Sequence, residues 1–152
     1  MALKLLIVDP DETWLGQAKK YFTDSMYDVT TVINGKEAQV TMYNTQYFAV
    51  IINYATENHS CMQVLKFIKT NYTNMQVIVM VNDKALVDSG DVTEEKLKKL
   101  GVAELAVKPF EITYIKELLE GHQSLSDMMM SVNKKEGVSE ETEVAMGDDS
   151  FT

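Results

Sequence analysis

The sequence predicts an α/β fold in which five parallel strands form a doubly wound sheet. Two observations predict it. Five short apolar runs recur along the 152 residues, and amphipathic stretches of helical period separate them. Nearly continuous apolar runs are typical of strands that are covered on both faces, as the strands of parallel sheets are. Strands that alternate with helices form one such sheet with helices on both faces.

Five strands are expected. The apolar runs are LKLLIV at 3–8, YDVTTV at 27–32, FAVII at 48–52, MQVIVMV at 75–81 and VAELAV at 102–107. The second run is the most mixed in polarity, so we expect it at an edge of the sheet. The only two prolines, Pro10 and Pro109, each follow one of these runs within two residues, which agrees with strands that end there.

Helices are expected over residues 12–24, 35–45, 61–70 and 92–100, and again from Ile112. The 12–24 stretch can place four apolar side chains on one face: Trp14, Ala18, Tyr21 and Phe22. Before the fourth helix, Asp91 and Glu94 have capping-box spacing, and residues 83–91 are expected to form a loop.

Composition excludes several classes of function. The net charge is −9, and all fourteen basic residues are lysine. Arginine is preferred for bidentate contacts to phosphates and base edges, so we expect no binding to nucleic acid or to an anionic membrane. The single cysteine, Cys61, excludes an internal disulfide. No apolar run approaches the roughly 18 residues of a membrane span, and the first strand begins where a signal peptide would lie, so we expect a cytoplasmic protein.

The charge divides the chain into two parts. Residues 1–121 carry 12 lysines and 16 acids, whereas residues 122–152 carry 2 lysines and 7 acids. We expect a domain over 1–121, followed by a helical extension and an acidic linker or tail over 122–152. An apolar stripe recurs every three or four residues from Ile112 to Val132, but Gly121 interrupts it at a cost of about 1 kcal/mol relative to alanine. Two outcomes stay open: the extended stripe forms a homodimer or partner contact, or the helix ends at Gly121.

Polar residues follow four of the five strands. They are Asp9-Pro10-Asp11 after the first strand, Asn53 after the third, Asn82 after the fourth and Lys108 after the fifth. In parallel sheets, ligands bind beyond the carboxyl ends of the strands. No glycine separates the first strand from its helix, so neither a dinucleotide fingerprint nor a P-loop is present.

These residues resemble the bacterial response-regulator receiver domain. The resemblance rests on LLIVD followed by an acid, a polar residue 44 positions later at the end of strand three, and VKPF after strand five. It covers residues 3 to about 121. It implies a flavodoxin-like strand order of 2-1-3-4-5 and a cis peptide between Lys108 and Pro109.

The site residues match the receiver motif only in part. In that family, acids after strand one and an aspartate after strand three bind Mg²⁺, and that aspartate accepts a phosphoryl group. Here Asp9 and Lys108 match, but Pro10 replaces the second acid and Asn53 replaces the acceptor. The position of the family's Ser or Thr is Asn82, and the aromatic switch position is Leu105.

These replacements predict a degenerate phosphorylation pocket. An amide is a far weaker nucleophile than a carboxylate, and Mg²⁺ prefers anionic oxygen ligands. Asp11 or another acid could substitute for the missing carboxylates, but the place of Asp11 at a helix start favours capping instead. We therefore expect no enzyme activity, no bound metal and no cofactor.

The expected function is that of a pseudo-receiver, which regulates a fused or partner output module by protein contact. The expected contact face is formed by the last two helices and the fifth strand: Leu97, Leu105, Ile112, Ile115, Leu118, Leu125 and Met129. Two alternatives stay open. One is a conditional phosphoacceptor in a phosphorelay, and the other is a small ligand in the vacated pocket. The abrupt end of the sequence also suggests a fragment of a longer protein.

Overall fold

The sheet has the predicted class and strand order. The computed structural model describes residues 3–121, and its five parallel strands lie in the order β2-β1-β3-β4-β5. The mixed run YDVTTV forms the edge strand β2, as expected. The strands are β1 Leu3–Val8, β2 Tyr27–Val32, β3 Ala49–Asn53, β4 Gln76–Val81 and β5 Glu104–Val107.

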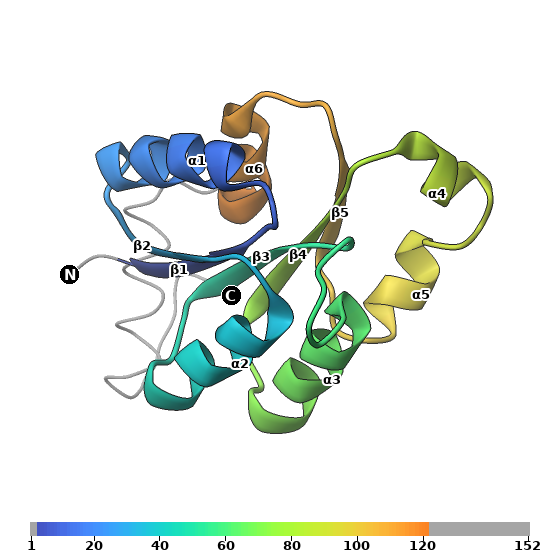
Figure 1. Cartoon of the computed structure of the whole chain (residues 1–152), viewed down its shortest axis with the longest axis horizontal. Coiled ribbons are helices and arrows are strands. Elements are labelled where there is room, and N and C mark those ends of the chain that lie inside the picture. The colour runs from blue at the N-terminus through green and yellow to red at the C-terminus, as the bar shows by residue number, and fades with distance from the viewer. Residues whose placement is uncertain (1–2, 122–152) are drawn as a thin grey trace, which may run out of the picture. The chain divides into compact units, whose positions relative to one another are not determined.

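Helices cover both faces of the sheet. Figure 1 shows α1 and α6 on one face, and α2, α3 and α5 on the other. The helices are α1 Glu12–Asp24, α2 Gly35–Asn44, α3 Cys61–Asn71, α4 Lys84–Asp88, α5 Glu94–Lys98 and α6 Ile112–Glu120. No helix among the residues that the structure describes is long and apolar enough to cross a membrane.

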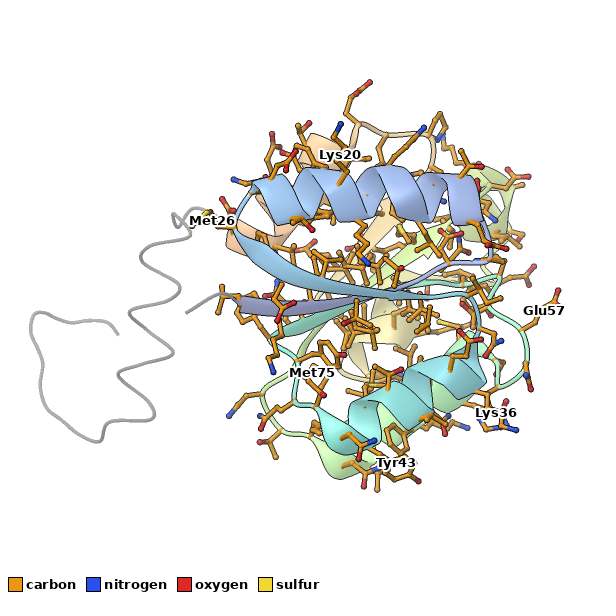
Figure 2. All side chains as sticks on the ribbon, turned by 60° about the vertical axis from the view of Figure 1, so that its left-hand side comes forward. Lys20, Met26, Lys36, Tyr43, Glu57 and Met75 are labelled. Carbon is orange, nitrogen blue, oxygen red and sulfur yellow. The ribbon has the colours of Figure 1, made fainter. Side chains whose placement is uncertain are left out.

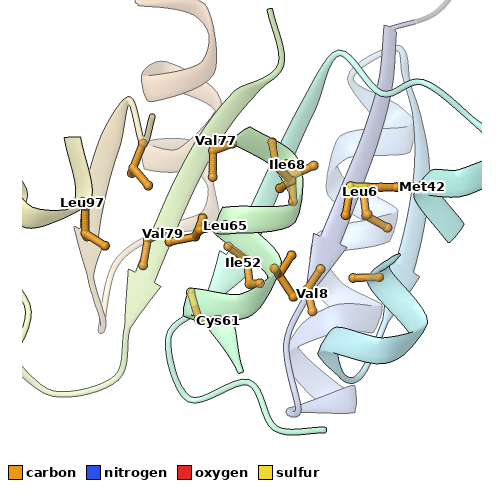
Figure 3. Packing of buried hydrophobic residues seen from close by; sticks show 14 of the residues in the cluster. Leu6, Val8, Met42, Ile52, Cys61, Leu65, Ile68, Val77, Val79 and Leu97 are labelled. Carbon is orange, nitrogen blue, oxygen red and sulfur yellow. The ribbon is translucent and has the colours of Figure 1, made fainter. Parts of the chain in front are cut away.

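The core follows from the alternation of side chains along the strands. Leu6, Val8 and Ile52 are fully buried in one hydrophobic cluster with residues of α2, α3 and α5 (Figure 3). Leu5 and Ile7, which are also fully buried, face the α1 and α6 side. Burial of each leucine or isoleucine stabilises the fold by about 1.5–3 kcal/mol, so the carboxyl ends of the strands are rigidly placed.

Helix α1 begins where the sequence predicts. Asp11 is its N-cap, because its side chain accepts hydrogen bonds from the backbone N–H groups of Thr13 and Trp14. The buried residues of the helix include Leu15, which the predicted face omitted. Trp14, by contrast, is only half-buried, because it lies at the edge of that face.

The predicted loop over 83–91 contains a further helix. Asp83 accepts a hydrogen bond from the N–H of Ala85 and starts α4, so the prediction of a loop is wrong. A five-residue helix is too short to show a helical period, and tertiary packing of Leu86 against the core holds it in place. The predicted capping box at Asp91 is also wrong. Thr93 caps α5 instead and accepts from the N–H of Lys96 at 3.1 Å.

Helix α6 ends at Glu120. Gly121 follows with φ of 58°, in the left-handed region that glycine enters without steric cost and that commonly ends a helix. A single helix therefore does not run through Gly121. The predicted extension, with Leu125 and Met129, lies outside the described residues.

The loop after β3 packs on the first turn of α2. The N–H of Gly35 donates to the carbonyl of Glu57 at 3.0 Å, and the N–H of Lys36 donates to that of Asn58 at 2.7 Å. A Cβ atom at position 35 would overlap the backbone carbonyl oxygen of His59. This close approach of two backbones requires glycine at position 35.

Candidate functional site

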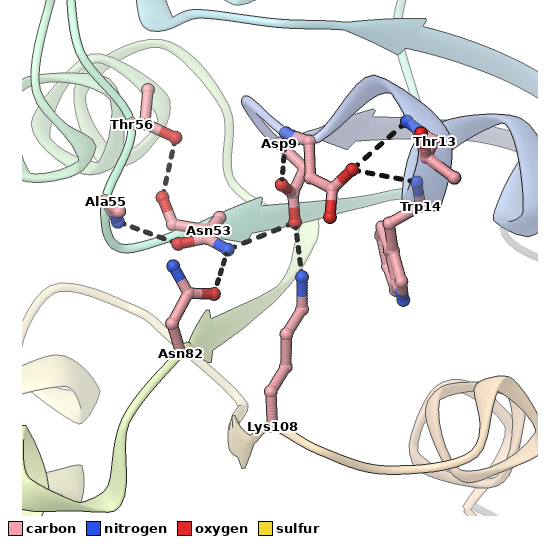
Figure 4. Close-up of polar contacts among 9 residues, drawn as sticks. Asp9, Thr13, Trp14, Asn53, Ala55, Thr56, Asn82 and Lys108 are labelled. Carbon is pink, nitrogen blue, oxygen red and sulfur yellow. Dashed lines mark hydrogen bonds and ion pairs between the residues drawn. The ribbon is translucent and has the colours of Figure 1, made fainter.

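Four of the predicted site residues meet at the carboxyl edge of the sheet. Asp9, Asn53, Asn82 and Lys108 lie at or just after the ends of β1, β3, β4 and β5, and these four strands are neighbours. Figure 4 shows their side chains in one hydrogen-bonded cluster. The sequence separates them by up to 99 positions, and the parallel sheet brings them together.

Asp9 is the centre of the cluster and is fully buried. Its Oδ1 accepts a hydrogen bond from the backbone N–H of Asp11 at 2.8 Å. Its Oδ2 accepts from Nδ2 of Asn53 at 3.1 Å and from Nζ of Lys108 at 2.9 Å. Both carboxylate oxygens thus have partners within the protein.

Asn53 is also fully buried, and its amide is fully engaged. Nδ2 donates to Oδ2 of Asp9 at 3.1 Å and to Oδ1 of Asn82 at 2.8 Å. Oδ1 accepts from the N–H of Ala55 at 2.8 Å. A carboxylate at this position has no proton for either acceptor. The surroundings of residue 53 therefore suit an amide.

Lys108 lies between a carboxylate and an aromatic ring. Its Nζ makes the ion pair with Asp9 and stands 4.3 Å from the centroid of the Trp14 ring. Its side chain is 17% exposed, so the ion pair is mostly shielded from water. Phe110 packs edge-on against Trp14, with ring centroids 6.5 Å apart. A cation over a tryptophan face gains about 0.5–2 kcal/mol, so Lys108 is held from two sides.

Two residues of this cluster were not predicted. Trp14 was assigned only to the buried face of its helix, although its place in the first turn after β1 puts it beside the carboxyl edge of the sheet. Thr56 is buried and its hydroxyl donates to the backbone carbonyl of Asn53 at 2.6 Å. Nothing in the sequence signals the contact of Thr56, because it depends on the course of the loop.

Within the described residues, the side chains of the other predicted site residues make no hydrogen bond to the cluster, although the backbone N–H of Asp11 does. Pro10 is exposed and has no side-chain donor or acceptor. Asp11 is exposed, and its Oδ1 caps α1. Leu105 is half-buried in β5 and packs against the hydrophobic cluster.

The polar cluster does not fit Mg²⁺. Asp9 is its only carboxylate, and the Oδ2 atom is already paired with the Lys108 ammonium. Oδ1 of Asn53, a neutral oxygen, is taken by the N–H of Ala55. No group of three His, Cys, Asp or Glu side chains within residues 3–121 is arranged to hold a metal. A hard dication needs more anionic oxygen than this arrangement supplies.

The predicted contact face requires a correction. Leu97 is 2% exposed and Ile115 is fully buried, so both belong to the core and cannot meet a partner. Their helices are amphipathic, and these two side chains are on the inner side. Leu105, Ile112 and Leu118 are half-buried and reach the surface.

Comparison with known proteins agrees on the fold. The chain resembles a signal receiver domain from Vibrio parahaemolyticus, with a TM-score of 0.73 and 20% identity over 88% of this chain and 99% of that one. It also resembles a response regulator receiver domain from Clostridium thermocellum, with a TM-score of 0.70 and 21% identity over 86% of this chain and 100% of that one. The chain has the receiver-domain fold.

A third similar structure contains bound Mg²⁺ and a beryllium fluoride. It is the response regulator TrrA from Thermotoga maritima in complex with Mg²⁺–BeF, with a TM-score of 0.67 and 21% identity over 80% of this chain and 98% of that one. By sequence, the chain matches no family model and no curated protein. At sequence identities of 20–21%, the similarity shows the fold and does not show the activity.

The cis peptide between Lys108 and Pro109, which the resemblance implied, is present. The ends of the apolar runs at positions 9, 53, 82 and 108 were likewise predicted correctly as one edge of the sheet.

Proposed function

We propose that this chain is a cytoplasmic pseudo-receiver: a signalling domain of the two-component type that acts by protein contact and takes no phosphoryl group. The observation that carries this proposal is the buried amide of Asn53, which donates to Asp9 and Asn82 and accepts from Ala55. It occupies the position at which the receiver resemblance expects the nucleophile.

The chemistry of phosphoryl transfer supports the proposal. An acyl phosphate forms when a carboxylate oxygen attacks phosphorus, and an amide oxygen is a poor nucleophile because its lone pairs are less basic. In-line transfer to a receiver also needs a cation to offset the charge of the phosphoryl oxygens. The pairing of the single carboxylate Asp9 with Lys108 and the amide of Asn53 both argue against these steps.

The contacts of Lys108 support a domain that keeps one conformation. A receiver that switches must release this lysine to a phosphate. Here Lys108 is paired with Asp9 at 2.9 Å and lies over the Trp14 ring. Breaking a shielded ion pair without a new partner costs about 3–5 kcal/mol, so the pocket is stable as it stands.

The proposed partner is a protein that binds the surface formed by α5, β5 and α6. Leu105, Ile112 and Leu118 are half-buried there, and Tyr114 is 40% exposed. Such side chains supply apolar contact area without destabilising the free domain. A fused output module or a second copy of the chain would use the same chemistry.

Amide NMR with Mg²⁺ and beryllofluoride tests the proposal. The wild-type chain is expected to show no shifts at Asp9, Asn53 or Lys108. The double variant Pro10→Asp with Asn53→Asp supplies both missing carboxylates and is the positive control. Shifts of the wild-type amides at the ends of β1, β3 and β5 would refute the pseudo-receiver.

The same experiment tests the conditional phosphoacceptor. That alternative would use Asp11 or another acid, and the Asp11 carboxylate caps α1 through two backbone N–H groups. The variant Asp11→Asn keeps a capping side chain but removes the charge. A wild-type response that disappears in Asp11→Asn would establish the alternative.

A further inference from the structure

A strip of apolar side chains, exposed on α2 and half-buried on α3, crosses these two helices. Among the described residues, five large apolar side chains are at least 40% exposed, and two of them, Val40 and Tyr43, lie three positions apart on α2. Side chains at this spacing lie on the same face of a helix. Val40 is 54% exposed and Tyr43 is 72% exposed, and Figure 2 shows Tyr43 at the outer side of α2.

The strip continues through aromatic contacts onto α3. The Tyr43 ring meets the ring of Phe67 edge-on, with centroids 5.5 Å apart. The Phe67 ring also contacts the ring of Tyr72, with centroids 6.3 Å apart. Single exposed apolar residues are ordinary, whereas a contiguous group on two neighbouring helices is typical of a binding surface.

A band of lysines lies beside this strip, on α3 and α5. These two helices and the residue after α5 contain five lysines and only two acids, Glu94 and Glu95, for a net charge of +3. Residues 1–121 as a whole have a net charge of −4. The lysines are Lys66, Lys69, Lys96, Lys98 and Lys99.

The contacts of α3 fix how the strip and the band are arranged. Phe67 lies on the flank of α3 that meets α2, because it contacts Tyr43. Lys69 lies on the opposite flank, because its Nζ donates to the carbonyl of Lys99 at 2.7 Å. Helical spacing places Lys66 on the exposed side between these flanks. Lys66 and Lys69 therefore give the apolar strip a basic border on its α5 side.

We infer that α2 and α3 form a docking surface for an amphipathic helix of a partner protein, with an apolar stripe and an acidic flank. The apolar stripe would pack against Val40, Tyr43 and Phe67, and the acidic flank would lie along the lysines of α3 and α5. Helix-in-groove binding uses this combination of apolar anchors and charged borders. The charge favours an acidic protein, since the band is basic within an acidic chain.

This surface is separate from the polar cluster around Asp9. The inference therefore holds whether or not the chain accepts a phosphoryl group, and its test does not depend on the proposed function. It adds a contact surface to the one proposed on α5, β5 and α6.

The test is a titration of the isotope-labelled full chain with a synthetic amphipathic helical peptide that has leucines along one face and glutamates beside them. Shifts are expected at the amides of Val40, Tyr43, Lys66 and Phe67, and salt should weaken the binding. A peptide with lysines in place of the glutamates is expected to bind at least about tenfold more weakly, because it meets like charge.

Variants with matched controls locate the surface. Tyr43→Ser removes the apolar anchor, and Lys66→Glu with Lys98→Glu reverses the border; each is expected to weaken binding by about tenfold. The controls are Tyr114→Ser on α6 and Lys19→Glu with Lys20→Glu on α1, which are expected to bind like the wild type. Lys69 is kept, because it holds the end of α5.

Three results would overturn the inference. The first is equal binding of the acidic and basic peptides. The second is a set of shifts on α6 instead of α2 and α3. The third is a mixed-sequence DNA duplex that displaces the acidic peptide from the same amides at the same salt, which would assign the surface to nucleic acid.

Discussion

Replacement of Asn53 by aspartate is expected to destabilise the domain in a pH-dependent manner. Nδ2 of Asn53 lies 3.1 Å from Oδ2 of Asp9, so Asn53→Asp places two carboxylate oxygens at this distance in a fully buried setting. At an effective dielectric constant of about 20, two unit charges at this separation repel by about 5 kcal/mol. Lys108 and a rotation of the Asn82 amide offset part of this repulsion.

Protonation sets an upper limit on the loss. Protonation of a carboxyl with an unfolded-state pKa of about 3.9 costs about 4 kcal/mol of free energy at pH 7. The protonated carboxyl can then donate a hydrogen bond to Asp9. We therefore expect Asn53→Asp to lower the free energy of unfolding by about 2–4 kcal/mol at pH 7.

The sign of the pH dependence follows from the repulsion between Asp9 and the carboxyl introduced at position 53. The neighbouring Asp9 raises the pKa of the introduced carboxyl in the folded state, so the folded state holds a proton that the unfolded state releases above about pH 4. The variant should thus lose stability as the pH rises from about 4, and the loss should level off above the folded-state pKa. Near pH 4 the difference from the wild type should fall below about 1 kcal/mol.

Urea unfolding of both proteins at pH 4.5 and pH 7, followed by circular dichroism, measures this difference. Asn74→Asp adds the same charge at an exposed bend and is the control, for which a change within about 0.5 kcal/mol is expected. A loss in Asn53→Asp that is the same at both pH values would refute the role assigned to the Asp9 charge.

Three further predictions concern phosphorylation, packing and the cysteine. Acetyl phosphate should not label Asn53→Asp alone, because Pro10 leaves Mg²⁺ without one of its carboxylate ligands. It should label the double variant Asn53→Asp with Pro10→Asp. Labelling of the single variant would contradict this prediction. Gly35→Ala should lower the free energy of unfolding by about 1–3 kcal/mol in thermal melts, because the added Cβ atom would overlap the backbone of His59 in the loop after β3. Gly16→Ala, in open space on α1, should instead raise stability by about 0.5–1 kcal/mol, and a similar response of both sites would count against the packing argument. Burial raises the pKa of the Cys61 thiol from 9.0 to about 12, so its thiolate fraction at pH 8 falls about a thousandfold. Iodoacetamide should therefore modify the folded chain about a thousandfold more slowly than the chain in urea, and equal rates would show that the thiol is accessible.

The features that the sequence predicted correctly depend on repeated or local signals. The five strands repeat an apolar pattern several times, so a one-residue error at the ends of β3 or β4 does not change the topology. The cap at Asp11 follows from a side chain two residues from its partner. Asp9, Asn53, Asn82 and Lys108 could be placed together because a parallel sheet aligns the ends of its strands.

The features that were missed depend on contacts between distant parts of the chain. Whether Ile115 faces the core or a partner cannot be decided from an amphipathic pattern, because both surfaces are apolar. The short helix α4 is held by packing of Leu86 and has no period of its own. The place of Trp14 over Lys108 joins residues 94 positions apart, so neither residue's neighbours in the sequence reveal it.

The hydrogen bond after Asn53 has a consequence for chemical ageing. Deamidation of an asparagine begins when the next backbone nitrogen attacks the side-chain carbonyl carbon, and it converts the residue to aspartate or isoaspartate. After Asn53 this nitrogen belongs to Tyr54 and donates to the carbonyl of Met80 at 2.7 Å, so it is turned toward β4. The Asn34-Gly35 pair, a sequence prone to this reaction, has its nitrogen engaged by Glu57 at 3.0 Å. We therefore expect Asn34 and Asn53 to keep their amides during long storage of the folded domain. As a result, no second buried carboxylate should form beside Asp9.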